Sequence, residues 1–134
     1  MADRFNRKTR SRIMAAIRGK NTAPELTVRS FLHRMGLRFR IHVPGLPGRP
    51  DLVFTKHRTV VFVHGCFWHQ HPRCRLARMP ASNRRFWTKK FSGNRERDRR
   101  TARKLRAAGW KVLTIWQCQL DERRLRRLAG HIAG

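Results

Sequence analysis

The sequence predicts a small α/β domain in which helices flank one mixed sheet. Segments with the apolar spacing of helices alternate along the chain with short apolar or alternating segments that are typical of strands. The 134 residues suffice for one ordinary hydrophobic core and are too few for two. We therefore treat residues 1–134 as a single domain.

The N-terminal part of the chain predicts two helices. Residues 8–18 place apolar side chains at helical spacing among basic ones, which indicates a basic amphipathic helix. The pattern Thr22-Ala23-Pro24-Glu25 is a capping box that opens a second helix, and Gly36 is a plausible end for it. The apolar face of this second helix contains Val28, Phe31, Leu32 and Met35.

The middle of the chain predicts three strands. Residues 37–43 alternate apolar and polar side chains, which is typical of a half-buried strand. A Pro/Gly loop follows at residues 44–50. Residues 51–54 and 59–63 are then two short apolar segments, which we expect to pair as a hairpin.

The C-terminal part predicts helix, strand and helix. Residues 80–91 indicate a loop and a short helix, and residues 94–108 indicate a very basic helix that ends at Gly109. Residues 110–116 alternate and predict another buried strand, and residues 121–132 predict a closing helix.

The charge of the chain points to a polyanionic partner. Lys and Arg number 33 against 7 acidic residues, a formal net charge of +26, which opposes folding unless a polyanion is near. Nucleic acid is the first partner to consider, because cationic side chains gain affinity by replacing counterions on phosphate. A membrane surface is the alternative, but no apolar run approaches the roughly 18 residues of a spanning helix. The N-terminus has no signal-peptide pattern, so we expect a cytoplasmic protein.

Residues 64–74 concentrate metal-binding side chains, with two of the three cysteines and three of the seven histidines. Cys66, His71 and Cys74 are close enough in sequence to reach one ion from a single loop. Cys118 directly follows the last predicted strand and reaches the same point if that strand lies beside the hairpin. Such a Cys3His set suits a structural Zn²⁺ ion. The alternative is three small buried cysteines and a surface histidine.

Three further side chains near this loop are candidates for chemistry. His64 and His69 remain once His71 is assigned to zinc. Each of them can act as a general base or a proton donor. The alternative is that both are solvated loop histidines. Asp51 belongs to a Pro-Asp pair before an apolar strand, which is the frame of many Mg²⁺-dependent nucleases. Such pairs more often mark a turn or the start of a strand, and the second strand has no Glu-x-Lys.

The other acidic candidates also have two explanations each. Glu25 is either the capping-box partner of Thr22 or a catalytic or metal-binding residue. Glu96 and Asp98 either pair with arginines of their own helix or orient a zinc-binding or catalytic histidine.

Several aromatic side chains of this basic chain are candidates for contact with the bases of DNA. Phe67 and Trp68 are neighbours in a loop, and an exposed aromatic pair on a basic protein can wedge between base pairs. Met14 either wedges from the other side or packs in the core, and Trp87 either contacts DNA or packs inward. We expect two further tryptophans in the core, Trp110 and Trp116.

Together these residues resemble the very-short-patch-repair (Vsr) DNA mismatch endonucleases. The matching segments occur in the order of the family over roughly residues 8–120. They are Thr9-Arg10-Ser11 with Met14, Thr22-Ala23-Pro24-Glu25, Leu46-Pro47-Gly48-Arg49-Pro50-Asp51, His64-Gly65-Cys66-Phe67-Trp68-His69-Gln70-His71, Phe86-Trp87, Asn94, Glu96-Arg97-Asp98-Arg99-Arg100, Gly109-Trp110, Trp116 and Cys118.

The resemblance implies a restriction-endonuclease-like fold of the PD-(D/E)xK type that is stabilised by a structural zinc ion. It implies Mg²⁺-dependent nicking of one DNA strand 5′ to the thymine of a T:G mismatch, the product of deaminating 5-methylcytosine. It further implies a bacterial protein associated with the nucleoid in the cytoplasm, with mismatch-repair proteins as partners. The oligomeric state stays open, and a monomer suits a single nick at an asymmetric mismatch.

The resemblance also implies roles for individual residues. Asp51 would hold Mg²⁺ together with the backbone carbonyl of Val63, a position where the family pattern leads us to expect Thr. His69 looks like the general base, assisted by His64 and Glu25. The positions that match zinc ligands are Cys66, His71, Cys74 and Cys118. The positions that match intercalating residues are Phe67, Trp68 and Met14.

Two other hypotheses fit the charge. A non-catalytic, zinc-organised DNA-binding module would keep the four zinc ligands but would not need Asp51, His64 and His69 together. A small basic RNA-binding protein is the third hypothesis, for which the apolar strands and four tryptophans are less typical.

Overall fold

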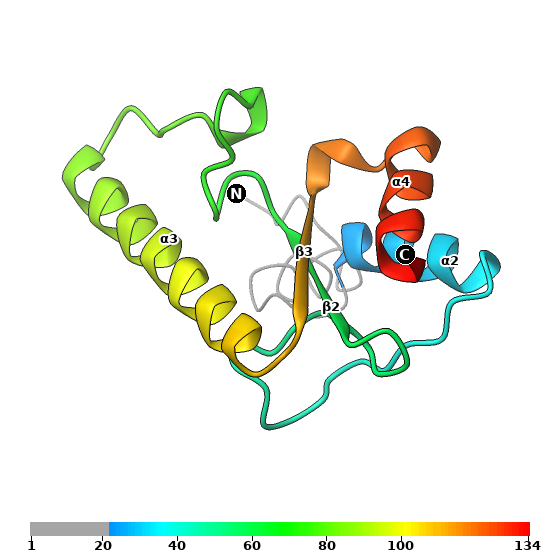
Figure 1. Cartoon of the computed structure of the whole chain (residues 1–134). Coiled ribbons are helices and arrows are strands. Elements are labelled where there is room, and N and C mark those ends of the chain that lie inside the picture. The colour runs from blue at the N-terminus through cyan, green and yellow to red at the C-terminus, as the bar shows by residue number, and fades with distance from the viewer. Residues whose placement is uncertain (1–21) are drawn as a thin grey trace, which may run out of the picture.

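The computed structural model describes residues 22–134 and contains a three-stranded sheet between helices (Figure 1). The predicted helix at residues 8–18, and with it Met14, lies outside the described residues. In chain order the elements are α2 (Ala23–Arg34), β1 (Leu52–Phe54), β2 (Thr59–His64), the 3-10 turn η1 (Arg75–Ala77), α3 (Arg84–Ala107), β3 (Lys111–Trp116), the 3-10 turn η2 (Gln117–Gln119) and α4 (Glu122–Ala133).

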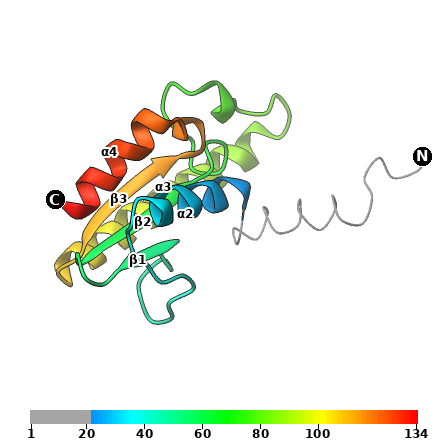
Figure 2. The ribbon, with the colours of Figure 1, turned by 90° about the vertical axis from the view of Figure 1, so that its right-hand side faces the viewer.

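The sheet has the order β1-β2-β3, which Figure 2 shows from the side. β1 and β2 pair antiparallel as the predicted hairpin, whereas β2 and β3 pair parallel with Val63 opposite Ile115. Parallel neighbours need a long crossover connection, and α3 forms part of it. The carboxyl ends of β2 and β3 therefore meet at one edge of the sheet, which brings the segments after them together.

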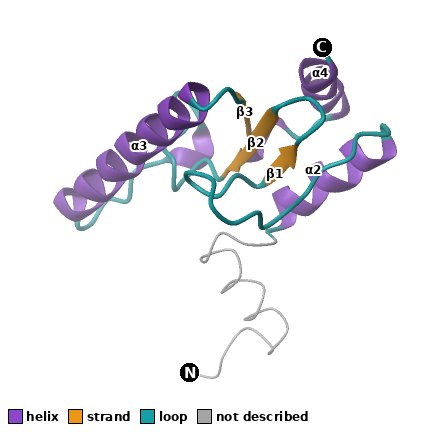
Figure 3. Ribbon diagram, turned by 60° about the horizontal axis from the view of Figure 1, so that its bottom comes forward, coloured by secondary structure: helices purple, strands orange, loops and turns teal. Residues whose placement is uncertain are grey.

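Helices cover both faces of the sheet, with α3 on one side and α2 and α4 on the other (Figure 3). The first core cluster packs Leu52 and Phe54 of β1 against the apolar faces of α2 and α4. The second packs Val53 and Val60 against Leu105 near the end of α3. Because the hairpin strands are covered on both faces, their sequences are nearly continuous apolar runs rather than alternating ones.

Side chains cap the helices that begin near the site. Thr22 Oγ1 accepts a hydrogen bond from the Glu25 N–H at 3.3 Å, and Asp121 accepts one from the Arg124 N–H at 2.9 Å. The predicted starts of α2 and α4 are thus confirmed. Among the described residues, no helix is both long and apolar enough to cross a membrane.

The predicted strand at residues 37–43 is wrong. Within it only Arg40 pairs, in an isolated bridge with Val53, and His42 turns the backbone with φ of 54°. The alternation reports burial at Leu37, which is buried, and at Phe39, which packs against the core beside Phe54, but not at Ile41, which is 38% exposed. This segment is extended enough to bury alternate side chains, but it makes no ladder with β1.

The predicted break between a short helix and a basic helix is also wrong, because residues 84–107 form the single helix α3. Gly93 lies in its interior, at a position where a Cβ atom would meet nothing within 4 Å. A glycine weakens a helix by roughly 1 kcal/mol without ending it. One continuous helix carries the aromatic residues at its start and the basic residues beyond.

Candidate active site and metal centre

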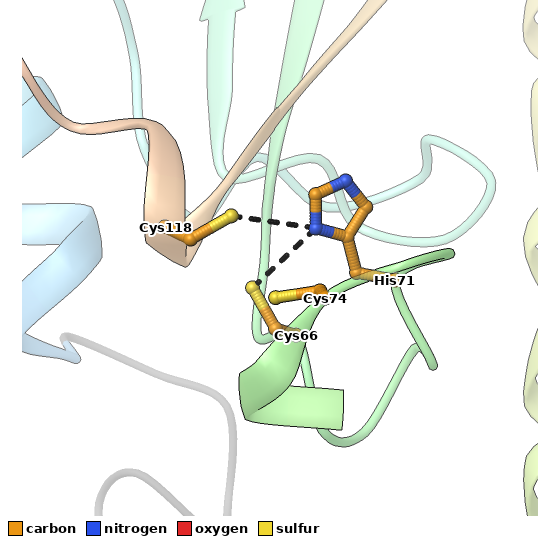
Figure 4. A group of neighbouring side chains, drawn as sticks. All are labelled: Cys66, His71, Cys74 and Cys118. Carbon is orange, nitrogen blue, oxygen red and sulfur yellow. Dashed lines mark hydrogen bonds between the residues drawn. The ribbon is translucent and has the colours of Figure 1, made fainter. Parts of the chain in front are cut away.

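Four predicted zinc ligands converge where β2 and β3 end (Figure 4). His71 Nδ1 lies 3.8 Å from Cys66 Sγ and 3.4 Å from Cys118 Sγ, and the ligand atoms of these three residues and Cys74 all lie within 4.8 Å of one another. Tetrahedral zinc, with its usual bond lengths, separates a sulfur from a nitrogen ligand by about 3.6 Å. The cluster therefore fits one tetrahedral metal ion.

Backbone and ring contacts hold this cluster in place. The Cys66 N–H donates to the side-chain oxygen of Gln117, which ties the loop after β2 to η2 at 3.3 Å. The ring of Trp116 stacks on His71 at 4.1 Å, so this tryptophan is half-buried against the ligands rather than deep in the core. Burial raises the pKa of the Cys66 thiol to about 12, so a bound metal ion has to displace its proton.

A cavity of about 1120 Å³ lies beside the Cys/His cluster. Its walls come from the start of α2, the loop before β1, the end of β2 and the middle of α3. All four predicted catalytic side chains line it: Glu25, Asp51, His64 and His69. The structure thus brings together residues that are up to 44 positions apart in sequence, and it adds Asp98 of α3 to them.

Asp51 occupies a corner of this cavity at the start of β1. Its Oδ2 accepts a hydrogen bond of 2.6 Å from the Val63 N–H. In a strand the N–H and C=O of one residue point to the same side, so the Val63 carbonyl also faces the side of Asp51. Burial raises the pKa of Asp51 to about 7, against the opposing effect of the Val63 hydrogen bond. A buried carboxylate of this kind ionises more readily beside a cation.

His64 and His69 lie face to face in the same cavity. Their rings stack with centroids 3.8 Å apart and planes 3° apart. His69 Nδ1 donates to Asp98 Oδ2 at 2.6 Å, because an ionised carboxylate can only accept. Burial lowers the pKa of His64 to about 4, and its buried Nδ1 has no hydrogen-bond partner among residues 22–134. The structure therefore presents one oriented histidine and one neutral histidine.

The structure distinguishes in part between the two explanations for Glu25, Glu96 and Asp98. Glu25 is buried, lines the cavity and pairs with Arg29 at 3.1 Å, in addition to its place in the capped first turn. Asp98 orients a histidine rather than pairing with an arginine of α3. Glu96 is exposed and lies 3.9 Å from Arg103 of its own helix.

An aromatic cluster borders the cavity at the start of α3. Phe67 packs edge-on against Phe91 at 5.1 Å and against Trp87 at 5.6 Å. It is therefore half-buried, which corrects the expectation that Phe67 and Trp68 form an exposed pair. Trp68 itself is 38% exposed and Phe86 is 59% exposed. The sequence pattern predicted no role for Phe86 or Phe91. The spacing of Trp87 and Phe91, four residues apart, is a signal that the two side chains share one face of a helix.

One wall of the cavity depends on a glycine that sequence patterns do not single out. Gly48 has φ of 70°, and a Cβ at this position would collide with Thr101 Cγ2 of α3. The loop before Asp51 therefore lies directly on α3, one helical turn beyond Asp98. Only glycine allows both this backbone conformation and this approach.

Known proteins resemble this chain over most of its length. The profile of the family described as DNA mismatch endonuclease Vsr matches residues 2–75. This chain belongs to the Vsr family. A type II nicking enzyme of Xanthomonas oryzae pv. oryzae, V.XorIIP, is 48% identical over 91% of this chain and 89% of its own length.

Two other relatives cover this chain almost completely. The DNA mismatch endonuclease Vsr of Escherichia coli is 44% identical over 100% of this chain and 90% of its own length. The type II nicking enzyme V.NmeAIP of Neisseria meningitidis serogroup A is 41% identical over 98% of this chain and 97% of its own length. The Vsr profile spans Asp51 and the loop as far as Cys74, and these longer matches also extend over Asp98 and Cys118.

Proposed function

We propose that this chain is a Mg²⁺-dependent DNA endonuclease that nicks one strand 5′ to the thymine of a T:G mismatch. Membership of a family of DNA mismatch endonucleases and similarity to nicking enzymes support DNA nicking. The observation that carries the proposal is the cavity, where the buried Asp51 lies with a histidine that Asp98 orients. A protein that only bound DNA would have no need for that combination.

Mg²⁺ fits the corner formed by Asp51 and Val63. Magnesium prefers oxygen ligands and is usually held by one or two carboxylates with substrate phosphate and water. Asp51 provides a carboxylate of which one oxygen is held by the Val63 N–H, and the Val63 carbonyl provides a second oxygen. The chemistry that such an ion supplies when bound is polarisation of the scissile phosphodiester.

The histidines provide proton transfer. Because His69 donates through Nδ1 to Asp98, its Nε2 is the nitrogen that can accept a proton from an attacking water molecule. The Asp98 carboxylate also stabilises the imidazolium that this step forms. His64 is stacked on the same ring and assists in proton transfer, and Glu25, which lines the same cavity, orients water.

Zinc is the metal that we assign to Cys66, His71, Cys74 and Cys118, in a structural role. All four protein ligands close the coordination sphere, as in structural rather than catalytic zinc sites. The catalytic histidines alternate along the loop with two of these ligands, so the ion fixes the loop that carries both. Removal of zinc should therefore displace the histidines.

We assign recognition of the mismatch to the aromatic cluster. Trp68 and Phe67 at the edge of the cavity, with Met14 from the N-terminal segment, would enter the base stack where a mispaired step is cheaper to open. Trp87 supports this wedge through contacts with both aromatic residues. Basic side chains of α3 would hold the phosphates on either side.

The proposal extends to the fold and setting. An antiparallel hairpin followed by a helical crossover to a parallel strand, with Asp51 before the first strand, is compatible with a restriction-endonuclease-like fold of the PD-(D/E)xK type. We further propose that residues 1–134 act as one domain, and that the enzyme works as a monomer on the bacterial nucleoid in the cytoplasm. Mismatch-repair proteins are the partners that we would test first.

The decisive experiment is nicking of end-labelled duplexes that carry T:G, T:A or C:G at one position in varied flanking sequences. With Mg²⁺, we expect cleavage of the thymine strand only, 5′ to the mispaired base, and none when Mg²⁺ is omitted. The preferred flanks would define the sequence context.

Two outcomes of this experiment would contradict the proposed nicking activity. If no duplex is nicked while zinc is bound and mismatched DNA still binds, the chain is the non-catalytic, zinc-organised DNA-binding module. If single-stranded or A-form RNA binds in preference to every duplex, the RNA-binding hypothesis replaces both.

A further inference from the structure

We propose that His64, His69 and Asp98 form a second metal site, separate from the Cys/His cluster, that takes Zn²⁺ or a similar transition-metal ion. Its occupation would stop nicking. The inhibitory effect rests on the proposed function, because it requires His69 to be the general base. Metal binding at these three side chains does not depend on that function.

The ligand atoms of the three side chains are already close together. One ring nitrogen from each histidine and a carboxylate oxygen of Asp98 all lie within 4.8 Å of one another. Two imidazoles and one carboxylate are the donor set of several catalytic zinc sites and of non-haem iron sites. The adjoining cavity leaves room for water to complete the coordination sphere.

Two features of the histidines favour an ion at this position. The buried Nδ1 of His64 has no hydrogen-bond partner in the described part of the chain, and a buried polar atom without a partner is destabilising. The 2.6 Å hydrogen bond from His69 to Asp98 already fixes the plane of the His69 ring. An ion bound between His69 Nδ1 and Asp98 Oδ2 would take the place of the proton in this hydrogen bond, and both side chains already face that position.

The chemistry of the donors separates this site from the one assigned to Mg²⁺. Asp51 and the Val63 carbonyl offer oxygen atoms, which suit a hard ion, whereas imidazole nitrogen suits zinc, nickel or copper. An ion at His69 Nδ1 leaves the ring proton on Nε2, which then has no lone pair to accept a proton from water. A transition-metal ion therefore acts as an inhibitor here even while Mg²⁺ stays at its own corner.

The structure also predicts what must change on binding. The stacked rings are nearly parallel, so their nitrogen lone pairs run side by side and do not converge. The rings have to tilt towards each other, which ends the stacking at 3.8 Å. The basic side chains of Lys90 and Arg97 also line the cavity and weaken the attraction for a cation. We accordingly expect weaker binding than at the Cys/His cluster.

The test uses the full chain loaded with one equivalent of Zn²⁺ and titrated with more Zn²⁺ by calorimetry, in buffer that contains excess Mg²⁺. We expect a second equivalent to bind to the unmodified protein and to be lost in both His64→Asn and His69→Gln. The matched control is His33→Asn, since His33 is exposed on α2 and outside the cavity. Co²⁺ in place of the second Zn²⁺ should give weak visible bands without sulfur charge-transfer absorption.

Nicking is then measured at each point of the titration. The second equivalent should slow nicking about a hundredfold, the usual contribution of a general base, and excess Mg²⁺ should not restore it. A variant counts as folded if it still binds the first equivalent of Zn²⁺ and unfolds cooperatively. If either histidine variant is not folded, Asp98→Asn replaces it as the test.

Several outcomes would overturn the proposal. The proposal is wrong if the unmodified protein binds only one equivalent of Zn²⁺. It is also wrong if both histidine variants still bind the second equivalent while Asp51→Asn does not. Normal nicking with one zinc site only would leave the proposed function intact and remove the second site. A second equivalent that depends on the histidines, in a protein that nicks no duplex, would retain the site and refute the function.

Discussion

The loop after β2 contributes to two neighbouring regions that differ in how well their polar groups are satisfied. In the Cys/His cluster, Cys66 and His71 meet Cys118 at distances that one metal ion bridges. In the cavity, the carboxyl of Asp51 has a raised pKa and His64 Nδ1 has no partner in the described structure. In the proposed enzyme, the first arrangement stabilises the fold by binding zinc, and the second holds groups that are satisfied by a cation and the substrate.

In the proposed enzyme, the segment from His64 to His71 serves both stability and chemistry, because its side chains alternate between the two regions. His64 and His69 face the cavity, whereas Cys66 and His71 face the metal cluster. The buried His64 Nδ1, which has no partner among the described residues, is tolerated on the cavity side because the contact with Gln117 and, in our proposal, a metal ion hold the loop on its other side. Substitutions on the two sides should therefore have opposite effects on stability.

The largest expected effect is on the metal cluster, through Cys66→Ser. Cys66 is fully buried, and its loss removes a thiolate ligand and leaves a hydroxyl that binds zinc poorly. We expect zinc binding to weaken by orders of magnitude, unfolding to become several kcal/mol easier, and nicking to disappear. Zinc content and thermal unfolding measure the result.

A chelator provides the matching control on the unmodified protein. Slow chelation should produce the same loss of stability, and added Zn²⁺ should reverse it. Full nicking by folded, zinc-free protein would contradict the structural role of this cluster.

The next effect is in the cavity, at the start of β1, through Asp51→Asn. We expect nicking to fall by at least about a thousandfold because the cation ligand is lost, while affinity for mismatched DNA changes little. Stability should rise rather than fall. The folded state binds the Asp51 proton more tightly than the unfolded chain does, with a pKa of about 7 against 3.8.

The pH dependence of unfolding tests this second claim. Because the unfolded chain releases the proton first, the contribution of Asp51 to stability is full below about pH 4 and is lost as pH rises to about 7. Asn at this position removes that loss, so unfolding at pH 8 without Mg²⁺ should become harder by about 1 to 4 kcal/mol. An Asn variant that is less stable than the parent at pH 8 would refute the account.

A smaller effect is expected for Asp98→Asn, which removes the charge that orients His69. Nicking should slow by roughly ten- to a thousandfold, with little change in affinity for DNA, and its dependence on pH should shift because the histidine loses its carboxylate partner. The matched control is Glu96→Gln on the same helix, which lies in an exposed ion pair and should change the rate less than about twofold. Equal effects of the two substitutions would argue against a positioning role for Asp98.

The smallest effect is expected for the aromatic cluster, through Trp68→Ala. Loss of stacking should weaken binding to a T:G duplex by about 1 to 3 kcal/mol, with less change for matched duplex. Phe67→Ala should instead lower stability as well, because Phe67 is packed between Trp87 and Phe91. Leu76→Ala, an exposed apolar residue outside this cluster, is the control. Band-shift titrations with both duplexes measure the difference.

Much of the site could be predicted from the sequence because its signals are local. Spacing within one loop identified three residues of the Cys/His cluster, and the Pro-Asp pair and remaining histidines identified residues that line the cavity. Caps and apolar periodicity placed the starts of α2 and α4 and the hairpin. Each of these depends on residues within a few positions of one another.

Tertiary structure decided the rest, because those features depend on which distant side chains come together. The pairing of Asp98 with His69 spans 29 positions and requires the middle of α3 to face the loop. The close approach of Gly48 to Thr101 depends on the same placement. Residues 37–43 had the alternation of a strand, but in the described structure they pair with the edge strand β1 through a single bridge, between Arg40 and Val53. Periodicity therefore determined the buried faces of the helices and hairpin strands, whereas packing between distant elements determined whether an alternating segment joins the sheet and which polar groups meet.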